Sequence, residues 1–291
     1  MSIALALPMT IAAVALCAAW FIPRVARPST AVWALTVSMV LTVAAIATLL
    51  LQLAAAGLSE LPIVADLVGW CRAVYGGQHG ATPVVGVGAL TILAVMAWRS
   101  VGFIRSVRAD ASNFDGVSGV EIVDVRKPLA FAVPGNPGGV VMSRAMLDEL
   151  GRDECVVVLA HENAHLRFHH HVFVNVARTC AAGLPLLAPF ARLVAFLTER
   201  WADEFAAERV GSRRLVADTI ARVALLPGMV TPLHARALSG SDVLSRFEAL
   251  ESPARVPARH AVALSIGIAS VAAAGVILQA HHLVDFVGHS R

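Results

Sequence analysis

Two histidines and a glutamate form the most chemically informative stretch of this sequence, His161-Glu162-Asn163-Ala164-His165. A helix turns about 100° per residue, so His161 and His165 project from one face and can bind one zinc ion (Zn2+) at about 2.0–2.1 Å each. Glu162 lies beside them and off the ligand axis, where its carboxylate can take a proton from a metal-bound water. The motif predicts a zinc peptidase. The alternative is a buried helix with two structural histidines.

A second pair of residues supplies the ligand that the two histidines lack. A catalytic zinc site has three protein ligands and one position open to water. Glu199 and Asp203 are also four positions apart, so one helix face would present both carboxylates. We expect Glu199 to bind the metal and Asp203 to accept a hydrogen bond from the far nitrogen of a ligating histidine. The alternative for the two acids is a solvated acidic helix face.

His171 is a competing third ligand. It follows His165 by six residues, as in extended zinc motifs where a glycine breaks the helix and lets a third histidine reach the metal. The glycine position holds Phe168 here, which predicts that the helix continues past His171. The run of histidines 169–171 is then expected as a polar patch on the helix surface. Zinc content of Glu199→Ala and His171→Ala variants distinguishes the two ligands.

The composition is typical of a membrane protein. Hydrophobic residues make up 57% of the 291 positions, charged residues 15%, and the mean hydropathy is +0.72. Because soluble domains carry about 25% charged residues, we expect a mainly α membrane protein in contact with a lipid bilayer. A net charge of +3 is too small to indicate direct binding of nucleic acid. The four cysteines include no Cys-x-x-Cys pair, and a disulfide framework is not expected.

Four uncharged, apolar segments are predicted to be transmembrane helices: residues 3–22, 31–56, 83–98 and 261–280. A helix of about 20 residues crosses a hydrocarbon core of about 30 Å. The third segment is short, and it could extend past Arg99 if that side chain reaches the interface. No basic stretch precedes the first segment, so we expect a retained span and not a signal peptide.

Arginine placement predicts the orientation in the membrane. Arginines follow the first span, follow the third span and precede the fourth, at positions 24, 27, 99, 105, 108, 255 and 259. The positive-inside rule then places both termini outside and the segment between the third and fourth spans in the cytoplasm. The expected organisation is a membrane region with three transmembrane helices (1–104), a cytoplasmic zinc metallopeptidase domain (105–257), and a fourth transmembrane helix with a short external tail (258–291).

The cytoplasmic domain is expected to be α+β. Segments 117–125, 129–133 and 140–142 are rich in Val and Ile and predict strands, with the turn 134–139 before the last. Ser143 can cap a short helix that ends near Leu150, and Asp153 can cap the helix of the zinc motif. Within residues 172–198, Gly183, Pro185 and Pro189 predict a helix, a bend and a returning helix that carries Glu199 back toward His165.

The residues of the two pairs carry a family resemblance. The stretches 161–165 and 199–207 resemble the gluzincin membrane peptidases, which combine H-E-x-x-H with E-x-x-x-D; segments 130–135 and 246–250 are also similar. Two related groups share the pattern, the BlaR/MecR antibiotic sensors and the HtpX-type quality-control proteases. Three spans before the zinc domain and one after it are closer to the BlaR/MecR layout. A penicillin-binding domain follows the last span of those sensors, and the present sequence ends at residue 291, so direct β-lactam sensing is not expected.

The resemblance implies a function but leaves alternatives. A BlaR/MecR-type protein would cleave a cytoplasmic transcriptional repressor, whereas an HtpX-like protein would degrade misfolded membrane proteins. A third hypothesis is a non-enzymatic membrane sensor or scaffold with a structural zinc site, against which the intact Glu162 argues. His234 and Arg246 have the chemistry of an oxyanion stabiliser, although structural roles are the alternative for both. The strand 140–142 could bind the protein or peptide substrate as an added β-strand.

Overall fold

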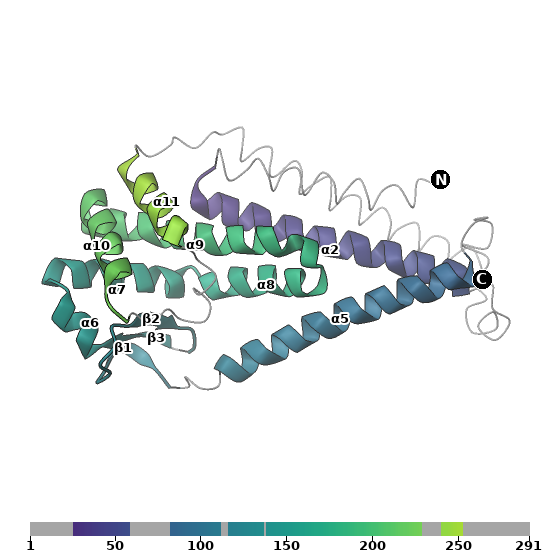
Figure 1. Ribbon diagram of the computed structural model, residues 1–291, viewed down its shortest axis with the longest axis horizontal. Helices are drawn as coiled ribbons and strands as arrows, with labels where there is room; N and C mark the ends of the chain where they lie inside the picture. Colours follow the sequence, from purple (N-terminus) through teal and green to yellow (C-terminus); the bar gives the residue numbers. More distant parts are fainter. Residues whose placement is uncertain (1–25, 59–81, 112–115, 137, 229–239, 253–291) are drawn as a thin grey trace.

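A computed structural model describes residues 26–58, 82–111, 116–136, 138–228 and 240–252 (Figure 1). The described part is mainly helical, with one small sheet. The predicted spans 3–22 and 261–280 and the candidate residue His234 lie outside these residues.

Two of the described helices are long and apolar enough to cross a membrane: α2, Pro28–Leu58, and α5, Pro83–Ala111. α2 includes the whole of the predicted second span. α5 continues well past residue 98, where its apolar run ends. The charged side chain of Arg99 is accommodated there because its Nε donates a hydrogen bond of 2.7 Å to the backbone carbonyl of Ala182.

The two long helices cross at a pair of glycines. A Cβ atom on Gly57 would lie 2.7 Å from the Cα of Gly86, and a Cβ on Gly86 would lie 2.9 Å from the Cα of Gly57. Backbones can approach this closely only where neither residue carries a side chain. Away from the crossing, α5 exposes large apolar side chains: Val84, Val85, Val87, Leu90, Ile92, Val95, Trp98, Val101 and Ile104. A lipid environment would cover such a surface.

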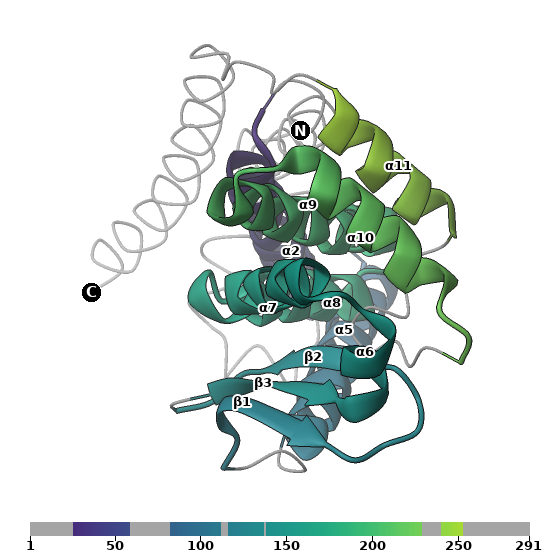
Figure 2. The same cartoon turned by 90° about the vertical axis from the view of Figure 1, so that its left-hand side faces the viewer.

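The sheet has three strands in the order β1-β3-β2: β1 is Ser118–Val123, β2 Ala130–Val133 and β3 Gly138–Ser143. β1 runs parallel to β3, and β2 runs antiparallel to it with Ala132 opposite Val140. Figure 2 shows β2 as the strand nearest α7. β3 is therefore the central strand and has no free edge. The expectation that 140–142 adds a substrate strand is wrong, because both edges of that segment are already paired.

The helix of the zinc motif, α7, spans Arg152–Arg167 and packs on β2 and β3. Ser143 caps the short α6, Arg144–Glu149, as predicted, and its Oγ accepts a hydrogen bond from the N–H of Met146. The predicted cap of α7 at Asp153 is wrong. Gly151 occupies the cap position and donates its N–H to Glu154 Oε2 at 2.7 Å, while Asp153 lies within the first turn. An acid there still favours the helix through its dipole.

α7 ends sooner than the sequence predicts. Phe168 lies just beyond its last residue, and His169 takes a left-handed conformation with φ of 53°. A second helix, α8, then begins at His170 and extends to Gly183. The prediction of one helix continuous past His171 is therefore wrong. The Nδ1–H of His169 donates to the carbonyl of Leu166 at 2.8 Å and stabilises the break.

The segment between the histidines and Glu199 folds as predicted, as a helix, a bend and a returning helix. After α8, the single turn η2, Pro185–Leu187, leads into α9, Ala188–Val210. This hairpin packs against the first half of α2, and Figure 1 shows the three helices side by side. Their shared core is made of Ala31, Val32, Leu35, Met39, Phe173, Ala177, Cys180, Leu187, Ala191, Val194 and Leu197. Glu199 follows this core directly, so the packing with α2 fixes the position of its helix.

Two further helices follow among the described residues: α10, Arg213–Leu225, and α11, Gly240–Glu251. Arg213 ties them to α9, because its guanidinium pairs with Glu204 and donates to the carbonyl groups of Ala249 and Leu250. A core between α7, α9, α10 and α11 contains Val157, Ala206, Ala207, Val216, Ala217 and Leu250. α11 is thereby held across α9, close to the acidic pair.

Candidate metal centre

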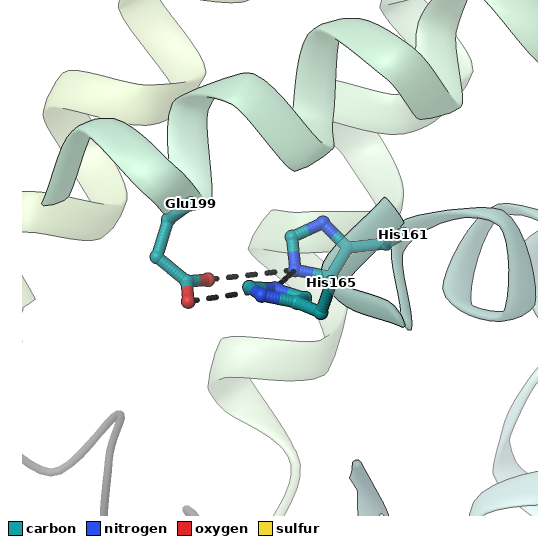
Figure 3. Close-up of side chains that lie close together, drawn as sticks. All are labelled: His161, His165 and Glu199. Carbon is teal, nitrogen blue, oxygen red and sulfur yellow. Dashed lines mark hydrogen bonds and ion pairs between the residues drawn. The ribbon is translucent and has the colours of Figure 1, made fainter. Parts of the chain in front are cut away.

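The structure brings together the two histidines of α7 and the glutamate of α9 (Figure 3). The Nε2 atoms of His161 and His165 are 3.2 Å apart. Glu199 Oε2 lies 3.4 Å from Nε2 of His161, and its Oε1 lies 3.6 Å from Nε2 of His165. Ligand atoms bound tetrahedrally to zinc at 2.0–2.1 Å lie about 3.3–3.4 Å from one another. The three side chains therefore fit a catalytic zinc site of two imidazoles and one carboxylate.

The outer nitrogen of His161 faces the second acid of the pair. Its Nδ1 lies 3.0 Å from Oδ1 of Asp203, a buried carboxylate. This contact leaves Nε2 directed at Glu199, the arrangement in which the far nitrogen is oriented by a carboxylate. Burial lowers the pKa of His161, but the hydrogen bonds and charges of Asp203 and Glu199 outweigh it and raise this pKa to about 10. The two acids thus favour positive charge at this imidazole.

Arg246 on α11 holds both acids. Its Nε and one terminal nitrogen donate to the two carboxylate oxygens of Asp203 at 2.7 Å each, and its other terminal nitrogen lies 3.2 Å from Glu199 Oε2. Burial alone would raise the pKa values of these acids, but Arg246 and His161 hold both pKa values below their usual range. The guanidinium is thus engaged by carboxylates, which argues against the oxyanion role considered for it from the sequence.

Glu162 lies on α7 between the two histidines, and its side chain is half-buried. Burial is the largest influence on its pKa and raises it to about 7; nearby His161 and Arg246 act in the opposite direction. The backbone N–H of Ala132 in β2 donates a hydrogen bond to its carboxylate. A carboxyl group with a pKa near neutrality can exchange protons efficiently near neutral pH.

The histidines of 169–171 divide into three environments. His169 forms the helix break, and His171 is exposed and is not part of the group that could hold a metal. His170 is 1% exposed, and its Nδ1 lies 3.2 Å from Nδ1 of His165. The expected polar surface patch is therefore wrong for His170, because its side chain is buried against His165 and does not lie on the helix surface. Burial lowers the pKa of His170 to about 2, so its ring is neutral.

An aromatic group borders the site on the side of the helix break. The ring of Phe168 stacks on Trp201 with centroids 4.7 Å apart and meets Phe205 edge-on at 5.3 Å. Trp201 lies two positions after Glu199, so these contacts link the end of α7 to the ligand-bearing part of α9. The packing helps to hold the two ligand-bearing helices at a fixed separation.

Comparison with known proteins agrees with the chemistry of this cluster. Residues 104–233 match peptidase family M48. The matched segment extends from the last residues of α5 past α10 and contains His161, Glu162, His165 and Glu199. It indicates a metallopeptidase domain. Arg246 on α11 lies beyond the matched residues.

A curated relative is similar over part of its length. A protease HtpX homolog from Salinibacter ruber (strain DSM 13855 / M31) is 36% identical over 72 residues, which are 24% of this chain and 26% of that protein. The chain thus spans about a quarter of the length of this relative. No solved structure matches the chain. Together with the two apolar helices, the two matches indicate a membrane protein with an M48-type metallopeptidase domain.

Proposed function

We propose that this protein is a membrane-embedded zinc metalloendopeptidase that cleaves protein substrates at the cytoplasmic face of the membrane. The observation that carries the proposal is the His161–His165–Glu199 cluster, whose ligand atoms have the mutual distances of a zinc site, with Glu162 beside it. The M48 match supports the same chemistry. A purely structural zinc site has no need of the adjacent Glu162, which argues against a non-enzymatic sensor or scaffold.

The chain's own residues provide the proton transfers of peptide hydrolysis. Bound zinc supplies a Lewis acid and a water of lowered pKa, and His161, His165 and Glu199 would hold it. Glu162 accepts the proton of the attacking water at its carboxylate and passes it to the leaving amine. Its pKa of about 7 suits both steps, and the N–H of Ala132 fixes the orientation of the carboxylate.

The free edge of β2 is the place where an extended substrate would lie. Within the described residues β2 pairs with β3 alone, and Figure 2 shows its other edge toward α7. The N–H of Ala132 points away from β3, as its hydrogen bond to Glu162 requires. A peptide added along this edge would pass the catalytic carboxylate, and main-chain hydrogen bonds would position the scissile bond.

The arrangement of the two described apolar helices supports a cytoplasmic location for the peptidase domain. This location is part of the proposal. Figure 1 shows the Pro28 end of α2 beside α9 and the Ala111 end of α5 toward the sheet. Arg27, just before α2, and the arginines in the second half of α5 therefore lie toward the same end as the peptidase domain. The positive-inside rule places that end in the cytoplasm. Both termini would then be outside, and the spans 3–22 and 261–280 would complete four crossings.

Two classes of substrate remain for this activity. A cytoplasmic repressor would follow from the BlaR/MecR resemblance, and misfolded membrane proteins would follow from the similarity to an HtpX homolog. The HtpX-like alternative fits the matches equally well. Comparison of the proteins that accumulate in wild-type and Glu162→Gln cells separates the two, because a dedicated regulator leaves one substrate uncut and a quality-control protease leaves many.

The Glu162→Gln variant of the full-length protein tests the activity. We expect it to bind zinc like the wild type while cleavage falls at least about 100-fold, because the amide cannot accept the proton. Zinc content is measured by elemental analysis and cleavage with a casein or peptide substrate in detergent. Glu208→Gln, an exposed acid on α9, is the matched control and should cleave normally. Undiminished cleavage by Glu162→Gln contradicts the mechanism.

A further inference from the structure

The second zinc ligand, His165, has a neighbour that is another imidazole. Its Nε2 faces His161 and Glu199, and its Nδ1 lies 3.2 Å from Nδ1 of His170. The two rings are perpendicular, with centroids 4.8 Å apart. Within the described residues, the first ligand thus has a carboxylate on its far nitrogen, whereas the second ligand has a buried histidine there.

The chemistry of imidazole determines the direction of this hydrogen bond. A histidine that binds a metal through Nε2 carries its hydrogen on Nδ1 and donates it to a neighbouring acceptor. Only one of two facing nitrogens can hold that hydrogen. If His165 binds zinc through Nε2, His170 must therefore accept at Nδ1 and carry its own hydrogen on Nε2.

We propose that His170 is a positioning residue for zinc, which accepts a hydrogen bond from Nδ1–H of His165 and so fixes the orientation and tautomer of this ligand. The inference rests on the proposed zinc site and assigns the partner of its second imidazole. His170 plays for His165 the part that Asp203 plays for His161, with a neutral acceptor in place of a charged one.

The surroundings of His170 hold it in this place. Its ring lies 4.8 Å from that of Trp201 and 5.9 Å from that of Phe168, and only 1% of the residue is exposed. His169, in its left-handed conformation, is the cap residue of α8, and His170 is the first residue of that helix. Among the described residues, its Nε2 has no hydrogen-bond partner and is buried. All polar contact of the ring is therefore through Nδ1, the atom that faces the ligand.

The test compares zinc affinity in full-length variants that differ in where an acceptor lies. Asn places its side-chain oxygen near the position of Nδ1, Gln places it near Nε2, and Leu has none. We expect His170→Leu and His170→Gln to weaken zinc binding about 10–100-fold, the usual effect of losing such a partner. His170→Asn should restore affinity to within a few fold of wild type. The zinc dissociation constant is measured by competition with a chromophoric chelator in detergent.

Two controls separate this role from a general effect on folding. Thermal unfolding in excess chelator measures the stability of the metal-free fold. We expect the zinc affinities of the His170→Asn and His170→Leu variants to differ by more than any difference in this stability explains. His171→Leu, the exposed neighbour, should bind zinc like the wild type. In cobalt-substituted protein, we expect the Leu variant to show an altered visible absorption spectrum and the Asn variant to resemble the wild type.

Each outcome decides the assignment. Equal zinc affinities of the Asn and Leu variants, or a Leu variant that binds like the wild type, would overturn the role of His170 and leave the zinc site standing. A wild-type protein without zinc affinity would overturn both. If the variants do not fold, 15N-labelled histidine in zinc-loaded wild-type protein decides by NMR. Hydrogen on Nε2 of His170 supports the role, and hydrogen on its Nδ1 overturns it.

Discussion

Arg246 connects the acid that faces the histidine pair with the acid that orients His161. Its side chain is 11% exposed, and it contacts Glu199 and Asp203 at distances between 2.7 and 3.2 Å. Without this guanidinium, two buried carboxylates would face each other across one helix turn. Arg246 therefore allows α9 to present both acids in charged form, which metal binding and the orientation of His161 require.

Replacement of Arg246 by Ala should lower the free energy of unfolding by about 3–5 kcal/mol, because loss of one partner leaves buried charges unpaired. Zinc affinity should fall as well, since Glu199 and Asp203 lose their orientation. Chemical denaturation and zinc titration measure the two effects. Arg214→Ala is the control: that side chain is 86% exposed and lies 3.8 Å from Asp218, so it should change stability by less than about 1 kcal/mol. Equal effects of the two substitutions would contradict the role of Arg246.

At the same scale, the sequence predicts which residues share a helix face, but it does not predict the contacts that Arg246 and His170 make with them. His161 with His165, and Glu199 with Asp203, follow from a four-residue spacing, and the structure places all four together. Whether the ligands bind zinc stays a prediction. From the sequence, Arg246 is a candidate oxyanion stabiliser and His170 part of a surface patch, because their contacts depend on how α11 and α8 are placed and not on local spacing. The adjacent histidines 169–171 are the one sequence signal that could have suggested a further imidazole near the site.

At the scale of elements, the break between α7 and α8 determines which histidine reaches the site. Continuous helix through this segment would place His170 at five positions from His165, turned away from it. The left-handed His169 changes that direction. A left-handed residue is usually glycine, and among the other residues asparagine, aspartate and histidine adopt this conformation more often than most. A single histidine is too weak a signal to predict the break. For this reason the sequence predicts a longer helix than the structure has.

A β-branched residue at position 169 should show how much the left-handed conformation there contributes to the free energy of unfolding. We expect His169→Val to destabilise the protein by about 1–2 kcal/mol, because valine is strained at a φ of 53°, and to weaken zinc binding by displacing His170. His169→Asn should be tolerated, since asparagine adopts this conformation readily. Thermal unfolding and zinc titration compare the pair. A valine variant as stable as the asparagine variant would show that the turn is not needed.

At the scale of the whole molecule, α2 belongs both to the pair of candidate membrane helices and to the packing of the peptidase domain. Its first half packs against the α8–α9 hairpin, and it crosses α5 at Gly57 near its far end. The helical character of both spans and the return of α9 were predictable from apolar runs and from the positions of Gly183, Pro185 and Pro189. The strand order was not, because hydrophobic patterns alone do not say which strand lies at the centre of a sheet.

The glycine crossing gives a prediction for the membrane part. Gly57→Ala would place a Cβ atom 2.7 Å from backbone atoms of α5, so we expect a loss of about 1–3 kcal/mol as the helices separate. Gly88→Ala has nothing within 4 Å of the added atom and should be neutral or stabilising by up to about 1 kcal/mol. Unfolding in mixed micelles with rising SDS measures both. Equal stability of the two variants would contradict a close contact at Gly57.

The metal ligands come from two helices, α7 and α9, which the chain connects through α8 and the bend at η2. His165 and Glu199 are 34 positions apart (199 − 165), and α8, η2 and the first half of α9 lie between them. A single ion bound by both residues would act as a cross-link that closes the loop of chain between them, as a disulfide does in a secreted domain. Removal of the ion by a chelator would then abolish catalysis and also remove this cross-link between the end of α7 and the middle of α9. We therefore expect the metal-free domain to unfold at a lower temperature.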